Sequence, residues 1–204
     1  MTLASQAPTI RPARPEDVPA VVAMVHELAE YERAPEQCHL TAEQLSAALF
    51  ATAPGRGAAS DAPSWSGRSP APALFGHVAV DAQDEPVGFA LWFLNFSTWE
   101  GVHGIYLEDL YVRPAARGTG AGRLLLATLA AICVERGYRR LDWWMIKWNP
   151  AAGFYASIGA VQMDEWVPYR LTGPALHGLA VQAVTSPTRP AVGTGRVPDR
   201  GDEA

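Results

Sequence analysis

The sequence has few cysteines, no long apolar run and no excess of positive charge. Its two cysteines, Cys38 and Cys133, are too few for a disulfide framework, and the apolar helical neighbours of Cys133 predict a buried free thiol. No segment approaches the roughly 18 apolar residues that a membrane-spanning helix needs, and no targeting segment is evident at the N-terminus. These features predict a cytoplasmic protein that does not associate with membranes.

The charge and the histidine spacing exclude two further classes of function. The formal net charge of −5 argues against a nucleic-acid partner and is compatible with a cationic small substrate, although most acidic domains are merely soluble. Metal sites place their ligands at short, regular spacings. The histidines show no such spacing, so no metal is expected: His26, His39, His77, His103 and His177.

The periodicity of apolar residues predicts an α+β fold. Strands are expected at residues 9–13, 74–81, 86–96, 104–112, 139–148 and 160–170. Helices are expected from Pro15 through Ala29, then at residues 41–50, 120–136 and 150–158. Thr41 and Gln44 form a capping-box pattern at the start of the second helix. Three consecutive strands joined by turns imply an antiparallel meander, and the later helix and strands complete one mixed sheet.

A single globular domain accounts for most of the chain. Residues 1–8 are expected to be a flexible N-terminus and residues 9–172 the folded domain. Residues 51–73, rich in Pro, Gly, Ala and Ser, predict a mobile loop inserted in that domain. Residues 173–204 have the composition of a disordered or lightly docked tail.

The segment "EDLYVRPAARGTGAGRLLL", residues 108–126, joins an acidic strand to a helix through a glycine-rich loop. It lacks the Lys-Ser/Thr pair of a P-loop, and Arg123 stands where the dinucleotide fingerprint requires glycine. What remains is Arg117-x-x-Gly120-x-Gly122 leading into a helix. Glycines let the backbone approach a ligand, and a helix N-terminus attracts anions, so the loop predicts a phosphate site.

This loop resembles the acetyl-CoA motif Q/R-x-x-G-x-G/A of the GCN5-related N-acetyltransferase (GNAT) superfamily. A closer similarity, to the diamine (spermidine/spermine-type) and thialysine acetyltransferases, comes from "HELAEYE", "YLEDLYV", "RGTGAG" and "WNPAAGFY". The resemblance covers residues 9–172. It implies a mixed, mostly antiparallel central sheet flanked by helices, acetyl-CoA as cosubstrate, and a homodimer.

The resemblance also implies where the coenzyme binds. In the family the pyrophosphate lies on the glycine loop, and the pantetheine arm pairs with the backbone of the preceding strand. The corresponding residues are Leu110, Tyr111, Val112, Arg117, Gly118, Thr119, Gly120, Ala121, Gly122, Arg123 and Asn149.

Transfer of an acetyl group to an amine needs two proton-handling groups. A lysine-like amine has a pKa of about 10.4 and must lose a proton before it attacks a thioester. By resemblance, Glu108 is the base and Tyr155 the acid that protonates the leaving thiolate. The sequence "WNPAAGFY" is one residue shorter between Asn149 and Tyr155 than is usual in the family, which leaves the orientation of that tyrosine open.

The resemblance implies an amine pocket lined by Glu32, Trp99, Glu108 and Asp109. Carboxylates attract ammonium groups, and an aromatic face adds a cation–π contact. The polyamine acetyltransferases carry an acidic residue where this chain has Ser97, which favours a shorter amine. Two alternatives stay open: a catalytically weak CoA-binding module, and a GNAT enzyme that acetylates another amine, such as a protein N-terminus or lysine.

Overall fold

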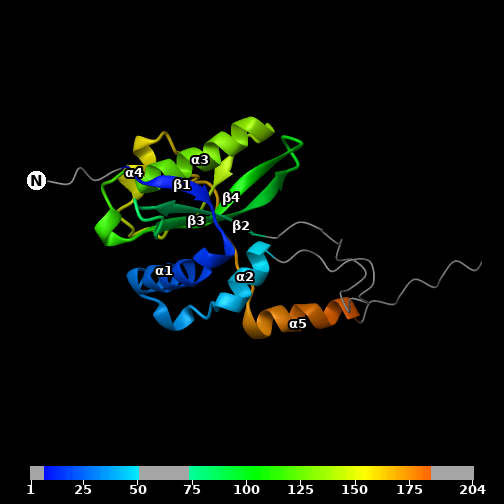
Figure 1. The fold of residues 1–204 in the computed structure, drawn as a ribbon. Helices are drawn as coiled ribbons and strands as arrows, with labels where there is room; N and C mark the ends of the chain where they lie inside the picture. Colours follow the sequence, from blue (N-terminus) through cyan, green and yellow to red (C-terminus); the bar gives the residue numbers. More distant parts are fainter. Residues whose placement is uncertain (1–6, 51–73, 185–204) are drawn as a thin grey trace, which may run out of the picture. The chain divides into compact units, whose positions relative to one another are not determined.

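The computed structural model describes residues 7–50 and 74–184 (Figure 1). The expectations for the N-terminal residues, for the 51–73 insertion and for residues 185–204 lie outside this range. The chain divides into two compact units, Met1–Lys147 and Trp148–Ala204, and each is described by itself. No helix in the described part of the chain has the length and apolar character needed to cross a membrane.

The first unit contains a five-stranded sheet in the order β1-β2-β3-β4-β5. Its strands are β1 (Thr9–Pro12), β2 (Phe75–Val80), β3 (Pro86–Ser97), β4 (Val102–Val112) and β5 (Leu141–Asp142). Neighbouring strands are antiparallel except for β4 and β5, which are parallel. The predicted meander and the mixed, mostly antiparallel sheet are therefore confirmed.

Helices cover both faces of this sheet (Figure 1). The α-helices of the first unit are α1 (Val18–Tyr31), α2 (Ala42–Phe50) and α3 (Ala121–Arg136), and the short 3-10 helices are η1 (Pro15–Asp17), η2 (Pro35–Gln37) and η3 (Pro114–Ala116). Helices α1 and α2 pack on one face and contribute Met24 and Leu45 to a core that includes Phe89 and Tyr111. Helix α3 lies on the other face and buries Leu125 and Leu129.

The two predicted helix starts are confirmed, each with its own capping geometry. The first begins at Pro15 behind Arg14, a poor capping residue, and the buried carboxylate of Asp17 instead accepts the Arg14 N–H at 2.7 Å. Arg11 on β1 donates to the same carboxylate at 2.6 and 2.9 Å, so this charge is paired. At α2, the Thr41 N–H donates to Gln44 Oε1 and the Gln44 N–H to Thr41 Oγ1, as a capping box requires.

The prediction of a strand at residues 139–148 is wrong in length, because the observed strand is much shorter. Only Leu141 and Asp142 pair with β4, opposite Ile105 and Tyr106. A strand exists only where a neighbour supplies its backbone hydrogen bonds, and β4 changes its register with β3 two residues after Tyr106. The apolar residues that follow Asp142 therefore have the composition of a strand but no ladder.

The second unit departs further from the prediction. The expected short helix is present as α4 (Ala152–Ser157), but residues 160–170 form no strand. A segment with the composition of a strand forms no ladder when no neighbouring strand pairs with it. Helix α5 (Gly173–Val184) occupies the start of the expected tail. Pro174 in its first turn is a helix-start signal that the Pro- and Gly-rich composition of the whole tail obscured.

Candidate active site

A β-bulge in β4 is the central feature of the site. Leu91 of β3 lies opposite Asp109, whereas the next residue, Trp92, lies opposite Leu107. Glu108 is therefore an extra residue without a partner on β3. Bulges bend a strand and redirect its side chains, and they occur often beside active sites.

The bulge changes the expected orientation of the two acidic residues. Strict alternation would place Leu107 and Asp109 on one face. Instead, Asp109 lies opposite Leu91, whose side chain belongs to the core under α1 and α2. Leu107 lies opposite the next residue, Trp92, and is buried outside that core cluster. The Glu108 side chain is exposed and Asp109 is half-buried. The two carboxylates thus differ in environment as well as in direction.

Two of the predicted site carboxylates, Glu108 and Glu32, act electrostatically on a third, Asp109. The pKa of Asp109 is raised to about 6, first by burial and then by the negative charges of Glu108 and Glu32. Glu32 follows the last residue of α1, and burial raises its pKa as well. The structure therefore brings Glu32, Glu108 and Asp109 together. A cationic group entering this cluster would relieve their repulsion, because an opposite charge stabilises the ionised form of each carboxylate.

The strand beyond the bulge has a backbone edge that no described strand covers. The Arg113 N–H donates to the Val87 carbonyl on β3 at 2.9 Å, so the backbone groups of Leu110 and Val112 point to the opposite edge. β5 pairs only with Ile105 and Tyr106, before the bulge. Arg117 Nε already donates to the Val112 carbonyl at 3.0 Å, so the groups open to an extended ligand are the Leu110 backbone and the Val112 N–H. Tyr111 instead faces β3 with its backbone and places its ring in the core.

The glycine loop after β4 leads directly into the N-terminus of α3. Gly118 and Gly120 have left-handed φ values of 80° and 91°, and Gly120 is the N-cap residue without a side-chain cap. A Cβ on either glycine would meet nothing within 4 Å. The first N–H groups of a helix have no acceptor within the helix, so this end suits a phosphate.

Other predicted coenzyme residues lie in the same loop or the first turn of α3. Thr119 Oγ1 donates to the Ala116 carbonyl at 2.7 Å, which closes the loop on η3. Ala121 is buried at the first position of α3. Gly122 and Arg123 follow in the first turn of α3. Arg117 Nε donates to the Val112 carbonyl at 3.0 Å.

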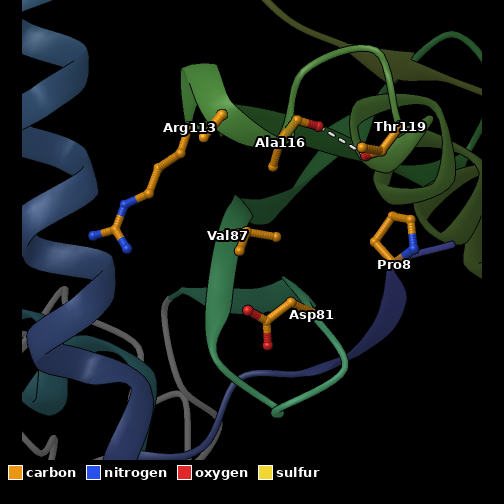
Figure 2. A pocket seen from close by; sticks show the side chains of 7 residues that line it. Pro8, Asp81, Val87, Arg113, Ala116 and Thr119 are labelled. Carbon is orange, nitrogen blue, oxygen red and sulfur yellow. Dashed lines mark hydrogen bonds between the residues drawn. The ribbon is translucent and has the colours of Figure 1, made fainter. Parts of the chain in front are cut away.

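A pocket of about 300 Å³ lies beside the glycine loop (Figure 2). Its charged side chains are already engaged: Asp81 accepts the N–H groups of Gln83 and Glu85, and Arg113 donates to Glu27 at 3.1 Å. Figure 2 shows the Arg113 side chain extending away from the other lining residues. This hollow therefore provides little that would orient a polar ligand. Its lining residues are Pro8, Asp81, Val87, Arg113, Ala115, Ala116 and Thr119.

Trp99 does not lie with the three carboxylates. It is 90% exposed in the turn between β3 and β4, where Ser97 pairs with Val102. Glu108 is six residues beyond Val102 along β4, which at about 3.4 Å per residue separates these two residues by roughly 20 Å. Ser97 is buried, and its hydroxyl accepts the Glu100 N–H at 3.2 Å. Ser97 therefore shapes the turn that carries Trp99.

The remaining predicted site residues, Asn149 and Tyr155, belong to the second unit. Asn149 Oδ1 accepts the Ala151 N–H at 3.0 Å and so forms the turn that precedes α4. Tyr155 is half-buried within α4, with its ring 5.2 Å from the ring of Phe154. The side chains of His, Cys, Asp and Glu in the described residues form no group of three or more that could hold a metal ion.

The site thus combines a bulged strand with an open backbone edge, an uncapped helix N-terminus and a cluster of carboxylates, and comparison with known proteins identifies the class of protein. A family model described as "Acetyltransferase (GNAT) family" matches residues 25–160. The thialysine N-epsilon-acetyltransferase of Bos taurus is 31% identical over 184 residues, covering 84% of this chain and 96% of the relative. The chain belongs to the acetyltransferase (GNAT) family and is an N-acetyltransferase.

Two further comparisons extend this result. The L-ornithine N5-acetyltransferase of Arabidopsis thaliana is 31% identical over 197 residues, covering 83% of this chain and 86% of the relative. Among solved structures, an integron cassette protein from the mobile metagenome of V. cholerae matches with a TM-score of 0.64 and 28% identity. That match covers 86% of this chain and 99% of the other.

Proposed function

We propose that this protein transfers the acetyl group of acetyl-CoA to a primary amine of a small cationic substrate, such as a diamine, a polyamine or a thialysine-like amino acid. The observation that carries the proposal is the bulge at Glu108. It lies between an uncovered backbone edge at Leu110 and Val112 and a cluster of three carboxylates. The first feature suits an extended coenzyme arm and the second suits an ammonium group.

The residues of this chain would bind the coenzyme in two places. The pyrophosphate would accept hydrogen bonds from backbone N–H groups at Gly118–Arg123, and the pantetheine arm would pair with Leu110 and Val112. The open space above Gly118 and Gly120 fits a close approach of the phosphate oxygens. Asn149 of the second unit is proposed as a further contact, on the strength of its place in the "WN" motif.

The reaction would proceed by direct attack. Glu108 takes one proton from the ammonium group, the neutral nitrogen attacks the acetyl carbonyl, and the carbon–sulfur bond breaks as the nitrogen loses a second proton to solvent and the amide forms. The departing thiolate receives a proton from Tyr155, which then regains one from solvent; the reference pKa is about 10 for a tyrosine hydroxyl and about 8.5 for a thiol. Glu32, Asp109 and the ionised Glu108 would hold the positive charge of the incoming substrate.

Asp109 is the second candidate for the base. General bases work best with a pKa near the working pH, and the Asp109 pKa of about 6 is closer to neutrality than that of an ordinary aspartate. The exposed Glu108 is more accessible to substrate and to an intervening water. The two assignments predict different pH profiles, which are set out in the Discussion.

The substrate proposal is supported by the names of the relatives. Thialysine and ornithine are both amino acids with an amine at the end of the side chain, and the relatives named for them are 31% identical to this chain. We therefore place short basic amino acids and diamines ahead of long polyamines.

We also propose a cytoplasmic homodimer. Phe96 is 52% exposed and Trp99 90% exposed on the β3–β4 hairpin, and large apolar side chains gathered at one place often mark an interface. Sizing of the purified protein in solution tests the dimer, and a monomer at all concentrations would contradict it.

The decisive experiment is acetyl-CoA-dependent release of free thiol with a panel of amines: thialysine, L-ornithine, a short diamine, spermidine and a lysine-containing peptide. Saturable release with the first three supports the proposal. Release with the peptide alone would favour the protein-acetylating alternative. Tight coenzyme binding with no release for any amine would identify a CoA-binding module.

A further inference from the structure

Arg117 occupies a junction between three elements of the first unit. It follows η3 at the start of the glycine loop, and its Nε donates to the Val112 carbonyl at the end of β4. Its guanidinium carbon lies 5.3 Å from the ring centroid of Tyr31 and 5.6 Å from that of Tyr111. Both distances are within the range of cation–π attraction.

One side of this junction is rigid. The Tyr111 ring is buried and lies 6.4 Å from the ring of Phe89. Its hydroxyl is hydrogen-bonded to Glu27, which also accepts from Arg113 Nε at 3.1 Å. Burial and the Glu27 contact together raise the Tyr111 pKa. Tyr111 therefore stays neutral and fixed, and it provides a firm surface for the guanidinium.

The other side of the junction is the last turn of α1. Tyr31 is the final residue of that helix, and Glu32 follows it as the C-cap residue. Arg33 then adopts a left-handed φ of 63°, which is unusual for a residue with a side chain, so the chain turns sharply at this point. Glu32 therefore lies where the helix ends, directly before the chain changes direction.

We propose that Arg117 is a positioning residue that couples the coenzyme loop to the last turn of α1, so that coenzyme and amine bind cooperatively. A phosphate bound at Gly118–Arg123 would hold the loop and hence the guanidinium. The guanidinium would in turn hold Tyr31 and set Glu32 against Asp109. Since such coupling is reciprocal, a cation held by Glu32 would tighten coenzyme binding by the same factor.

This inference rests on the proposed function, and one calorimetric experiment separates the two. The dissociation constant of coenzyme A, which has no acetyl group to transfer, is measured with and without saturating thialysine. The dissociation constant of thialysine is measured with and without coenzyme A. We expect each ligand to tighten the other by about 5- to 150-fold, the usual range of allosteric coupling.

Conservative variants test the contact itself. Arg117→Lys keeps the charge but loses the planar group that donates to Val112 while it lies over two rings. It should bring the coupling factor close to one, and because that factor is the ratio of two dissociation constants measured in the same variant, any change in the affinity for coenzyme A alone does not affect it. Tyr31→Leu should lose the coupling as well, whereas Tyr31→Phe keeps the ring and should retain it. The double variant Arg117→Lys with Tyr31→Leu should lose no more than either single variant.

Arg123→Lys is the matched control, because it makes the same exchange in the first turn of α3. It should alter the affinity for coenzyme A without altering the coupling factor.

No binding of coenzyme A to the native protein would overturn the proposed function itself. Binding of both ligands with a coupling factor of one, or with a factor unchanged in Arg117→Lys and Tyr31→Leu, would overturn the role of Arg117 and leave the enzyme proposal intact. Melting temperatures establish whether each variant is folded. If Arg117→Lys does not fold, the comparison of Tyr31→Leu with Tyr31→Phe tests the contact.

Discussion

The two halves of β4 belong to one strand but have different surroundings. Before Glu108, Ile105 and Tyr106 have β3 on one side and β5 on the other, and Ile105 and Leu107 are fully buried. After Glu108, the segment Asp109–Val112 pairs with β3 alone and ends at the glycine loop. One unpaired residue separates a structural segment from one with an open edge. The proposed site thus lies where the pairing with a second strand stops.

The largest effects should follow from replacing each of the two carboxylates at the bulge, Glu108 and Asp109. Loss of a general base costs about 10²- to 10⁴-fold in rate. If Glu108 is the base, Glu108→Gln should lose that much at pH 7 and recover as pH rises, because more of the amine is already neutral. Turnover against pH from about 5.5 to 9 is the measurement, with thialysine and a short diamine as substrates.

Asp109→Asn is the matched control for that exchange. As a substrate-holding residue it should mainly raise KM, and the acid limb of the pH profile should remain. Disappearance of an acid limb near pH 6 in Asp109→Asn, together with near-native turnover in Glu108→Gln, would transfer the role of base to Asp109.

The structural half of β4 should respond through stability. A Cβ on Gly104 would lie 2.6 Å from both Asn95 Oδ1 and Arg140 Cγ, and Arg140 pairs with Asp142 on β5 at 3.0 Å. Gly104→Ala should therefore destabilise the fold by about 1–3 kcal/mol, the usual cost of overpacking. Its affinity for coenzyme A should stay near native. Denaturant unfolding measures the first quantity and calorimetry the second.

Gly153→Ala provides the comparison for Gly104. Gly153 lies in α4 with nothing within 4 Å of its would-be Cβ, so alanine there should be neutral or stabilising by up to about 1 kcal/mol. If Gly104→Ala proved as stable as Gly153→Ala, small shifts of the neighbouring side chains would relieve the crowding at Gly104.

Substitutions in the glycine loop that follows Asp109–Val112 should change the affinity for the coenzyme. The glycines at the two ends of α3 test this expectation. Gly120 and Gly137 both have left-handed φ values, 91° and 70°, and open space around them. Alanine at either position should cost about 1–2 kcal/mol of stability, because an L-residue is strained there. Only Gly120→Ala should also weaken coenzyme A binding, by about tenfold, or ~1.4 kcal/mol. Equal coenzyme affinities in the two variants would remove the pyrophosphate from this loop.

The smallest expected effect concerns Asp109 and stability. Its pKa is raised to about 6 in the folded protein, so between about pH 4 and 6 the folded state binds more protons than the unfolded state. Stability attributable to this group therefore falls as pH rises through that window. Asp109→Asn should be more stable than the native protein at pH 8, by about 1 kcal/mol after allowance for partial solvent exposure. The gain should vanish below about pH 4, and thermal unfolding at both pH values measures it.

Local signals in the sequence were sufficient where a residue acts on its immediate neighbours. The Thr41 and Gln44 side chains bond to each other's backbone N–H groups, so their spacing alone predicts the start of α2. The glycines at 118 and 120 accept left-handed φ, so their spacing predicts the turn into α3. These features need no information about distant residues. The outer ends of the predicted strands were less secure, because each needs a partner.

The sequence by itself determined the order of β1 to β4, the starts of α1, α2 and α3, and the glycine loop, since short-range backbone chemistry decides them. Only the tertiary structure decided that Glu108 is bulged, that Asp109 lies with Glu32, and that β5 stops after Asp142. It also brought Arg117 between Tyr31 and Tyr111, which are 80 positions apart in the chain. These outcomes depend on which strand supplies each hydrogen bond and on which side chains share a buried face. Both are properties of the packed chain and not of any local segment.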